Sequence, residues 1–281
     1  ADRFDSAVVS LRDIGTFGKP ILDLGVPVFA LGLNPNLRNP FLVARLFQIC
    51  QRFKPDMVQG WMYHGNLAAT AAASLLQRKV SLAWNIRQSL YQLENEKWLT
   101  RMAIRTGRRL SGRADAIVFN SVVSKEQHKT FGYSDKCATV IPNGFDLDQW
   151  KPQLQARNRL RESLSIAADS VVIGHVARFH PMKDHANFLK ACVNLAARLP
   201  NVYFLLAGTR VDLFNLEIRN VIPVELDHRF RFLGDYNPIS DLMSAIDVFC
   251  LSSRWGEAFP NVLGEAMSMG IPCVATDVGD S

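Results

Sequence analysis

Three consecutive runs near the end of the chain decide its fold: Asp247-Val-Phe-Cys-Leu-Ser-Ser253, Arg254-Trp-Gly-Glu-Ala-Phe-Pro260 and Asn261-Val-Leu-Gly-Glu-Ala-Met-Ser-Met-Gly270. They predict a short apolar strand, a turn, and a helix that Asn261 caps. At the carboxyl edge of a parallel sheet, the free N–H groups and positive end of such a helix favour a phosphate group. The stretch therefore predicts an anion site in an α/β sheet.

Two carboxylates accompany this anion site. Glu257 falls in the turn, and Glu265 falls one turn into the helix. A step of about 100° per residue puts Glu265 at the edge of the apolar stripe, outside the core. There it could accept hydrogen bonds from ribose hydroxyls, while Glu257 could reach groups beyond the phosphates. The alternative is a solvated loop charge for Glu257 and a partner of the helix dipole for Glu265.

Length and composition predict a globular protein with two domains. The chain has 281 residues, of which 48% are hydrophobic, enough for two separate cores. No apolar run approaches the roughly 20 residues of a membrane span, and the first residues do not form a secretion signal. Five single cysteines, without metal-binding spacing, favour a reducing compartment. We therefore expect a cytoplasmic protein without a bound metal.

The formal net charge of +6 suits nucleic acid, an anionic membrane surface or a phosphorylated substrate. The densest basic stretch, 97–113, predicts an amphipathic helix that packs through the side carrying Leu99, Met102, Ala103, Thr106 and Leu110. No nucleic-acid-binding motif accompanies this stretch, which disfavours a nucleic-acid partner. Peripheral contact with the inner face of the membrane remains open.

Strand-like and helix-like segments alternate along the whole chain, which is typical of parallel βαβ units. The first half predicts strands at 7–11, 26–31, 57–62, 80–86, 116–120 and 139–141, and helices at 40–53, 66–76, 96–110 and 123–131. The second half predicts strands at 171–176, 202–207, 231–233, 248–251 and 273–276, and helices at 186–199, 239–245 and 261–269. We expect Rossmann-like domains at 1–145 and 171–281, joined by a polar linker at 146–170 that contains a short helix.

Two cations belong to the loop after the first strand of the second domain. Arg178 and Lys183 leave the same carboxyl edge as Glu257, so both could converge on one diphosphate. Arginine supplies forked hydrogen bonds, and lysine supplies a compact point charge. Either residue alone is typical of a solvated loop. The combination with the 257–265 stretch favours a diphosphate site.

A series of motifs runs in order along the second half of the chain: Gly174-His-Val-Ala-Arg178 with Lys183, Leu205-Leu-Ala-Gly208, Phe232-Leu-Gly234, Asp247-Val-Phe249, Ser252-Ser253, the 257–265 stretch and Gly270-Ile-Pro-Cys-Val-Ala-Thr-Asp-Val-Gly279. This series resembles the retaining glycosyltransferases of family 4. The resemblance implies an α/β protein of the GT-B fold, with two doubly wound Rossmann-like domains that face a cleft. The family's first strand, its glycine-rich loop and its final helices have no counterpart here. We therefore expect both domains to be incomplete.

The resemblance also implies residue roles on the donor side. Arg178 and Lys183 would hold the donor diphosphate, Glu257 the sugar hydroxyls and Glu265 the ribose. Phe232 would pack near the base. The pocket for phosphate and sugar would be lined by the backbone of Ala258, Phe259, Pro260, Asn261 and Val262. The family's front-face mechanism needs no covalent nucleophile, so support of the leaving diphosphate is the main catalytic effect.

On the acceptor side the resemblance is less complete. His64 in Gly60-Trp-Met-Tyr-His-Gly65 is similar to a family histidine with a catalytic role, and Asn85 stands where many members have a second histidine. Arg87 follows closely and could contact phosphate or acceptor; a structural ion pair is the alternative. Asn143 and Gly144 belong to the segment 140–146 that resembles the end of the family's first domain. For His64 the alternative is a structural imidazole.

Taken together, the resemblance implies transfer of a hexosyl group from a nucleoside diphosphate sugar to a sugar or lipid-linked acceptor, in polysaccharide or glycoconjugate synthesis. Asp146-Leu-Asp148 follows a turn, so we interpret it as turn chemistry and expect neither metal nor cofactor. Two alternatives remain. One is an epimerase or phosphorylase of the same fold, and the other is a non-catalytic, membrane-associated subunit that binds a nucleotide sugar.

Overall fold

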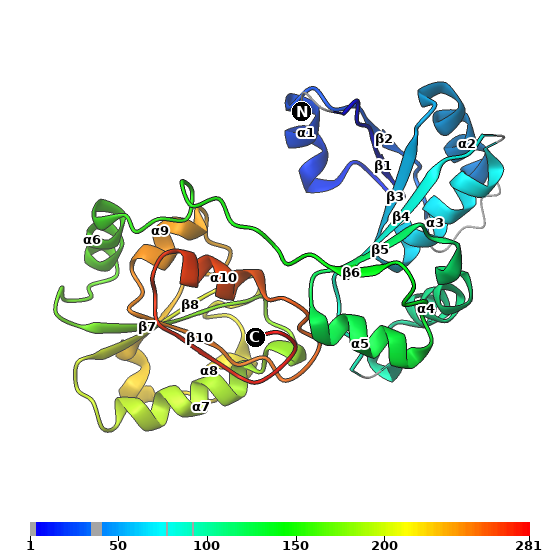
Figure 1. Ribbon diagram of the computed structural model, residues 1–281. Coiled ribbons are helices and arrows are strands. Elements are labelled where there is room, and N and C mark those ends of the chain that lie inside the picture. The colour runs from blue at the N-terminus through cyan, green and yellow to red at the C-terminus, as the bar shows by residue number, and fades with distance from the viewer. Residues whose placement is uncertain (1–3, 35–40, 77, 92) are drawn as a thin grey trace. The chain divides into compact units, whose positions relative to one another are not determined.

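The computed structural model describes residues 4–34, 41–76, 78–91 and 93–281, and the chain divides into two compact units (Figure 1). The first unit comprises Ala1–Ile86, Gln92–Phe119 and His128–Val140. The second comprises Arg87–Tyr91, Asn120–Gln127 and Ile141–Ser281. Two short segments, 87–91 and 120–127, therefore belong to the second unit, although the first unit flanks them in sequence.

The first unit contains parallel sheets, as the alternating pattern predicts. Its main sheet has the order β3-β4-β5-β6, and β1 and β2 form a separate parallel pair. The strands are β1 (Val8–Ser10), β2 (Val28–Ala30), β3 (Met57–Trp61), β4 (Ser81–Ile86), β5 (Ala116–Phe119) and β6 (Ala138–Val140). All residues of β4 except the first are buried, which explains its continuous apolar run. Every strand predicted in this half is present.

Helices connect these strands. They are α1 (Gly15–Asp23), α2 (Phe41–Phe53), α3 (Met62–Leu75), α4 (Trp98–Leu110) and α5 (Val122–Phe131), with single turns at Leu93–Asn95 and Ser111–Arg113. Helix α1 was not predicted, because two glycines and Pro20 interrupt its apolar spacing. Helix α3 begins at Met62 rather than at residue 66. Residue 40, where we expected α2 to begin, lies outside the described residues.

The prediction for the packing face of α4 was wrong in part. Its buried residues are Ala103, Ile104 and Gly107, whereas Leu99 and Met102 are exposed. A Cβ atom at Gly107 would lie 2.5 Å from the hydroxyl of Tyr133, so the small residues allow close contact there. Apolar periodicity favours the bulky side chains, but close packing selected the small ones.

The second unit contains one parallel sheet of order β11-β10-β7-β8-β9. Its strands are β7 (Val171–Val176), β8 (Val202–Ala207), β9 (Phe230–Phe232), β10 (Val248–Leu251) and β11 (Cys273–Ala275). The chain builds outward from β7 to β9, then crosses to the other side of β7 and adds β10 and β11. The boundary between β7 and β10 is therefore a topological switch point, where open α/β sheets bind ligands at their carboxyl edge.

Helices cover both faces of this sheet, so the second unit is doubly wound as predicted. One face packs against α7 (His185–Ala196) and α8 (Leu216–Arg219), and the other against α6 (Leu154–Ser163), α9 (Ile239–Ser244) and α10 (Asn261–Ser268). Strand β8 serves both cores by alternation: Phe204 and Leu206 face one, Leu205 and Ala207 the other. Helix α8 and the turns at Val224–Arg229 were not predicted.

The polar stretch 146–170 is packed into the second unit. Its short helix, α6, was expected, and Leu160 of α6 and Ile166 are buried in the core cluster that also contains Leu242 of α9. In the described part of the chain, no helix is both long and apolar enough to cross a membrane.

Candidate functional site

Two loops meet at the switch point of the second unit. The loop 177–184 leaves β7, and its first residues run along the end of β8 through Ala177 N–H to Ala207 O (3.0 Å) and Phe179 N–H to Thr209 O (2.9 Å). Gly208 makes this approach possible: its φ is +141°, and a Cβ atom there would lie 2.2 Å from Ala177 O. The second loop, 252–260, leaves β10.

The two loops are tied together by backbone and side chains. Arg254 N–H donates to Met182 O at 2.7 Å. Gly256, with φ +80°, lies against the Met182 side chain, and a Cβ atom there would be 2.7 Å from the sulfur. These contacts fix the loop 252–260 against the loop 177–184.

Lys183 and Glu257 meet across the switch point. The ammonium of Lys183 contacts Oε1 of Glu257, and the hydroxyl of Ser253 donates to the same oxygen at 2.6 Å. The side chains of Lys183 and Glu257 are only 14% and 9% exposed. Glu257 is therefore a buried, paired carboxylate rather than a solvated loop charge. A charge pair excluded from water at this edge is typical of a functional site.

The helix that follows, α10, begins differently from the prediction. Asn261 is its first helical residue and Pro260 its N-cap, without a side-chain cap. The prediction that Asn261 caps the helix was therefore wrong. Its amide oxygen instead accepts a hydrogen bond from Asn143 Nδ2. The N–H groups of the first turn of a helix lack intrahelical partners, so this end of α10 keeps the capacity to bind an anion.

Glu265 lies half-buried on α10, as the helical spacing predicts. Burial raises the pKa of its carboxyl group above the ordinary value. Ala266 and Leu263 are buried beside it, but Met267, which the spacing assigned to the apolar stripe, is exposed. Glu265 thus occupies the border between core and solvent.

The remaining donor-side residues differ in burial and in the elements that carry them. Arg178 is exposed in the loop after β7. Ala258 and Pro260 are buried, Val262 is half-buried, and Phe259 stacks on Phe145 with 6.2 Å between ring centroids. Phe232 ends β9, two strands from β7, and stacks on Phe230 at 6.3 Å. It contributes to the core under α7.

The predicted acceptor-side residues divide between the two units. In the first unit, His64 is exposed in the first turn of α3. Asn85 is buried in β4, where the side chain of Asn66 bonds both its N–H (3.3 Å) and its C=O (3.4 Å). In the second unit, the guanidinium of Arg87 donates to Asn143 Oδ1. Asn143 in turn reaches Asn261, so these residues form one chain of hydrogen bonds; Gly144 follows Asn143 directly.

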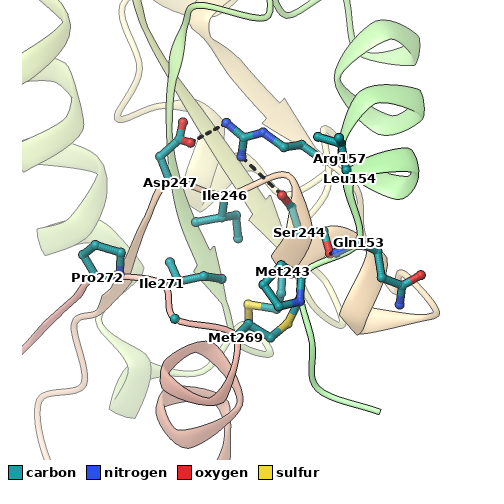
Figure 2. Close-up of a pocket in the computed structure, with 12 residues that line it drawn as sticks. Gln153, Leu154, Arg157, Met243, Ser244, Ile246, Asp247, Met269, Ile271 and Pro272 are labelled. Carbon is teal, nitrogen blue, oxygen red and sulfur yellow. Dashed lines mark hydrogen bonds and ion pairs between the residues drawn. The ribbon is translucent and has the colours of Figure 1, made fainter. Parts of the chain in front are cut away.

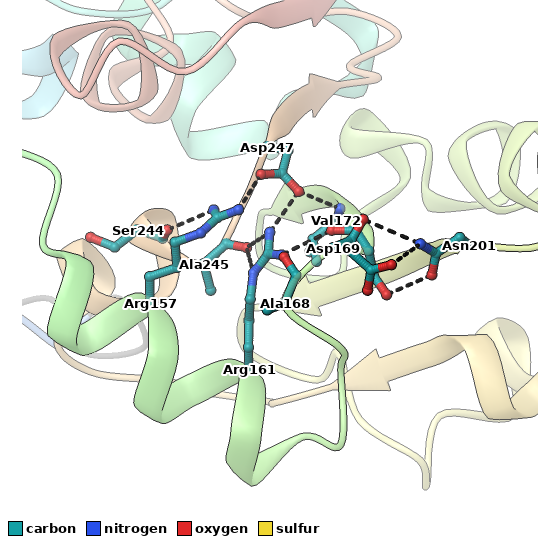
Figure 3. Close-up of polar contacts among 10 residues, drawn as sticks. Arg157, Arg161, Ala168, Asp169, Val172, Asn201, Ser244, Ala245 and Asp247 are labelled. Atoms are coloured by element: carbon teal, nitrogen blue, oxygen red, sulfur yellow. Dashed lines mark hydrogen bonds and ion pairs between the residues drawn. The ribbon is translucent and has the colours of Figure 1, made fainter.

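A cluster at the opposite edge of the same sheet escaped the sequence analysis (Figure 3). Asp247, which precedes β10, accepts from Arg157 and from Arg161, both at 2.6 Å, and from Val172 N–H at 2.7 Å. Burial alone would raise the pKa of Asp247, but these hydrogen bonds outweigh it and hold the pKa below its ordinary value. Arg161 is 3% exposed and also donates to Ala245 O. The cluster fastens α6 to the sheet.

A cavity of about 330 Å³ opens beside this cluster (Figure 2). Its lining residues include Gln153, Arg157, Ser244, Asp247 and Ile271. Because Asp247 lies at the amino end of β10, the cavity belongs to the edge away from Lys183 and Glu257. It is therefore separate from the candidate site.

Among the described residues, no group of three or more His, Cys, Asp or Glu side chains could hold a metal ion. The Asp146-Leu-Asp148 segment forms a turn, as interpreted from the sequence. Asp148 N–H donates to the carboxylate of Asp146 at 2.9 Å, which is the geometry of an Asx turn.

Comparison with known proteins places the chain in a family. A family model described as Glycosyltransferase Family 4 matches residues 1–149, more than half of the chain. The chain belongs to this family. A second model, described as Glycosyl transferases group 1, matches residues 170–281. The family membership that the motifs suggested is confirmed.

Solved structures confirm the fold. The crystal structure of Anabaena Alr3699/HepE in complex with UDP is similar, with a TM-score of 0.82 and 27% identity over 98% of this chain and 73% of that chain. The sucrose-phosphate synthase of Thermosynechococcus elongatus has a TM-score of 0.74 at 17% identity, over 99% of this chain and 72% of that chain. The chain has the GT-B fold, as the resemblance implied.

Curated relatives match over about half of the chain. A protein of Bacillus subtilis (strain 168) that is named "Putative glycosyltransferase EpsF" is 38% identical over 138 residues, which are 49% of this chain and 35% of EpsF. The UDP-Gal:alpha-D-GlcNAc-diphosphoundecaprenol alpha-1,3-galactosyltransferase of Escherichia coli is 30% identical over 142 residues, which are 50% of this chain and 36% of that protein. The matched region thus covers little more than a third of each relative. The chain is homologous to glycosyltransferases.

Proposed function

We propose that this chain carries the donor site of a retaining glycosyltransferase, which moves a hexosyl group from a nucleoside diphosphate sugar to a sugar or lipid-linked acceptor in polysaccharide or glycoconjugate synthesis. The observation that carries the proposal is the buried contact between Lys183 and Glu257 at the switch point. Crystal structures of the similar HepE contain UDP and UDP-glucose, and the similar Escherichia coli enzyme is named for UDP-Gal and a diphosphoundecaprenol-linked sugar. Both support the proposed substrate classes.

In this proposal the cations of the loop 177–184 stabilise the leaving diphosphate. Exposed Arg178 supplies forked hydrogen bonds, and Lys183 supplies a charge that Glu257 already holds in place. The first turn of α10 adds N–H groups to the phosphate and sugar pocket formed by 258–262. Such preorganised charge lowers the barrier most when it faces the negative charge that develops on the leaving group.

Other residues would select the donor and the acceptor. Glu257 would accept hydrogen bonds from sugar hydroxyls, Glu265 from the ribose, and Phe232 would pack near the base. In the first unit, His64 would contact the acceptor. In the second unit, Arg87 would contact phosphate or acceptor, with Asn143 and Gly144 in support. Asn85 is buried and would support the neighbouring residues rather than touch the acceptor. His64 would assist catalysis from the acceptor side.

The proposal includes neither metal nor cofactor, because two cationic side chains and a helix terminus supply the charge that the diphosphate needs. If so, a chelator such as EDTA leaves the transfer rate unchanged. A loss of transfer that added Mg²⁺ or Mn²⁺ restores would contradict this part of the proposal.

We also propose that the protein acts in the cytoplasm and touches an anionic membrane surface through α4. Trp98, Leu99 and Met102 are exposed there, and Arg105 and Arg109 are exposed on the same helix. Apolar side chains beside cations are typical of interfacial helices. Arg105→Gln/Arg109→Gln should reduce co-sedimentation with vesicles that contain anionic lipid. Lys190→Gln/Arg198→Gln removes the same charge from α7 and the turn that follows it, and should not. Equal binding by both variants would contradict the proposed membrane face.

The central test is a panel of nucleoside diphosphate sugars given to the full protein, with product detection and NMR assignment of the anomeric configuration. We expect a glycoside that retains the donor configuration, and its loss in Lys183→Met and in Glu257→Gln proteins that remain folded. Free epimerised sugar or a sugar phosphate would instead indicate an epimerase or a phosphorylase. Donor binding without product would indicate a non-catalytic subunit. Wild-type turnover in both variants would contradict the assigned donor site.

A further inference from the structure

A buried polar cluster lies behind the ion pair of the candidate site. His175, the penultimate residue of β7, is fully buried, and its Nε2 lies 3.1 Å from the hydroxyl oxygen of Ser252. Ser252 directly follows β10 and is also buried. The two side chains thus connect the ends of the strands that border the switch point.

The hydrogen bonds of Ser252 determine the protonation of His175. The serine hydroxyl has one hydrogen, which it donates to Lys183 O at 2.8 Å, with Asp184 O at 3.3 Å. Ser252 must therefore accept from His175, which carries its proton on Nε2. Burial, together with the nearby His185 and Lys183, lowers the pKa of His175 well below the ordinary value, so the ring is neutral.

The next serine acts on the other member of the pair. Ser253 is buried, and its hydroxyl donates to Glu257 Oε1 at 2.6 Å. Its own carbonyl accepts from Thr276 Oγ1 at 2.5 Å. Two successive residues, Ser252 and Ser253, therefore reach the backbone of Lys183 and the carboxylate of Glu257.

The cluster contains buried polar atoms without hydrogen-bond partners, and packing alone does not explain them. In the part of the chain that the structure describes, Nδ1 of His175 and Nδ1 of neighbouring His185 are buried without hydrogen-bond partners. The two rings lie 4.7 Å apart, and Nε2 of His185 faces Ala177 O at 3.3 Å. An apolar side chain of similar size would fill this space without a buried unsatisfied acceptor. The hydrogen bond that His175 donates to Ser252 therefore explains why a histidine occupies this position.

We propose that His175, Ser252 and Ser253 are positioning residues of the donor site. The bond from His175 orients the Ser252 hydroxyl, which holds the main chain of Lys183, while Ser253 holds the carboxylate of Glu257. The effect on donor binding rests on the proposed function. The effect on the geometry of the ion pair does not.

The geometric part can be tested without any substrate, through the reactivity of Lys183 toward an amine-labelling reagent such as acetic anhydride. Exposed Lys190 on α7 provides an internal reference. Ser252→Ala and His175→Leu should raise the labelling rate of Lys183 by about fivefold relative to Lys190, which corresponds to the loss of one net hydrogen bond. His175→Gln, whose amide can donate from a similar position, should restore protection.

A matched control exists on α9. Ser244 is as buried as Ser252, accepts from Gln153 N–H at 3.1 Å and donates to Ser240 O at 2.9 Å. Ser244→Ala therefore removes an equivalent pair of bonds away from the ion pair and should leave the labelling of Lys183 unchanged. Unchanged labelling in folded Ser252→Ala and His175→Leu proteins would overturn the proposal. If one variant fails to fold, the other decides; if both fail, Ser253→Ala, which removes the bond to Glu257 Oε1, should raise the labelling of Lys183, with His175→Gln as the protected reference.

The functional part uses UDP as the probe, with isothermal titration. Ser252→Ala and Ser253→Ala should each raise the dissociation constant of UDP about fivefold, and His175→Gln should bind like the wild type. Wild-type affinity in both serine variants would overturn the role of the cluster in donor binding. A wild-type protein that binds no nucleoside diphosphate would instead contradict the proposed function, and the labelling result would still decide the positioning role.

Discussion

Lys183 and Glu257 are 74 positions apart in the sequence, yet the ammonium of one contacts the carboxylate of the other at the carboxyl edge of the second sheet. The contact follows from topology. Lys183 belongs to the loop after β7 and Glu257 to the loop after β10, and these two strands are neighbours only because the strand order reverses there. The reversal turns two loop residues into a buried charge pair.

The burial of this pair predicts strong coupling between its members. Lys183→Met or Glu257→Gln alone leaves the remaining partner unpaired in a site that is largely closed to water. Breaking a buried pair in this way lowers the free energy of unfolding by about 3–5 kcal/mol. The double variant Lys183→Met/Glu257→Gln removes both charges. We therefore expect it to lose less unfolding free energy than the two single variants lose together. Urea unfolding of the three variants measures this coupling. Additive costs would show that the pair is not coupled.

The cluster around Asp247 predicts unequal roles for its two arginines. Arg161 is buried and donates to Asp247, Ala245 and Ser170. Arg161→Met should therefore lower the unfolding free energy by about 3 kcal/mol or more. Arg157 binds the same carboxylate but is 28% exposed, and Arg157→Met should cost about 1 kcal/mol. Urea unfolding checks both values, and equal costs would contradict the ranking.

Asp247 also predicts a loss of stability in acid. Its pKa is lower in the folded chain than in the unfolded chain, where it is about 3.9. Its contribution is therefore present above about pH 4 and is lost as the pH falls through the folded value. Asp247→Asn should be less stable than the wild type at pH 7, and this difference should narrow below about pH 4. A difference that stays constant with pH would contradict the assignment.

The buried histidines predict a separate loss of stability in acid, which begins at a higher pH than that of Asp247. Burial lowers the pKa of His185 to about 4 and that of His175 well below its ordinary value, whereas unfolded histidines titrate near 6.5. Between these values the unfolded chain binds more protons, so stability falls as the pH drops below about 6.5, by up to about 1.4 kcal/mol per pH unit for each histidine. His175→Gln should flatten this dependence. Urea midpoints from pH 7 to 4.5 test it, and equal slopes would contradict it.

Sequence patterns anticipated the elements that depend on periodicity. The apolar runs predicted the strands, and the end of each strand placed Arg178, Lys183 and Glu257 at one edge. Periodicity did not anticipate α1, whose glycines and proline interrupt it, or the packing face of α4. That face depends on the small volumes of Ala103 and Gly107. A hydrophobic pattern gives weight to apolar character and does not take side-chain volume into account.

Single polar residues within apolar runs were harder still to interpret. His175 and Ser252 form no repeat, and only the three-dimensional structure brings them to Lys183 O. The cap assigned to Asn261 failed for a related reason: Pro260 occupies that position, and a distant residue, Asn143, binds the side chain instead. Long-range hydrogen bonds leave no local pattern in a sequence.

We predict that removal of the Glu265 charge raises the stability of the chain and weakens nucleotide binding. Its raised pKa means that the folded chain disfavours the ionised carboxylate, so at neutral pH ionisation of this group costs stability. Glu265→Gln keeps the shape and removes the charge. We expect it to raise the melting temperature by a few degrees, and to weaken UDP binding because the proposed ribose contact would lose a charged acceptor. Calorimetry and titration with UDP measure the two effects. Met267→Ala, at an exposed position on the same helix, is the control and should change neither the melting temperature nor UDP binding. If Glu265→Gln were less stable than the wild type and bound UDP equally well, the carboxylate would be a structural residue of α10.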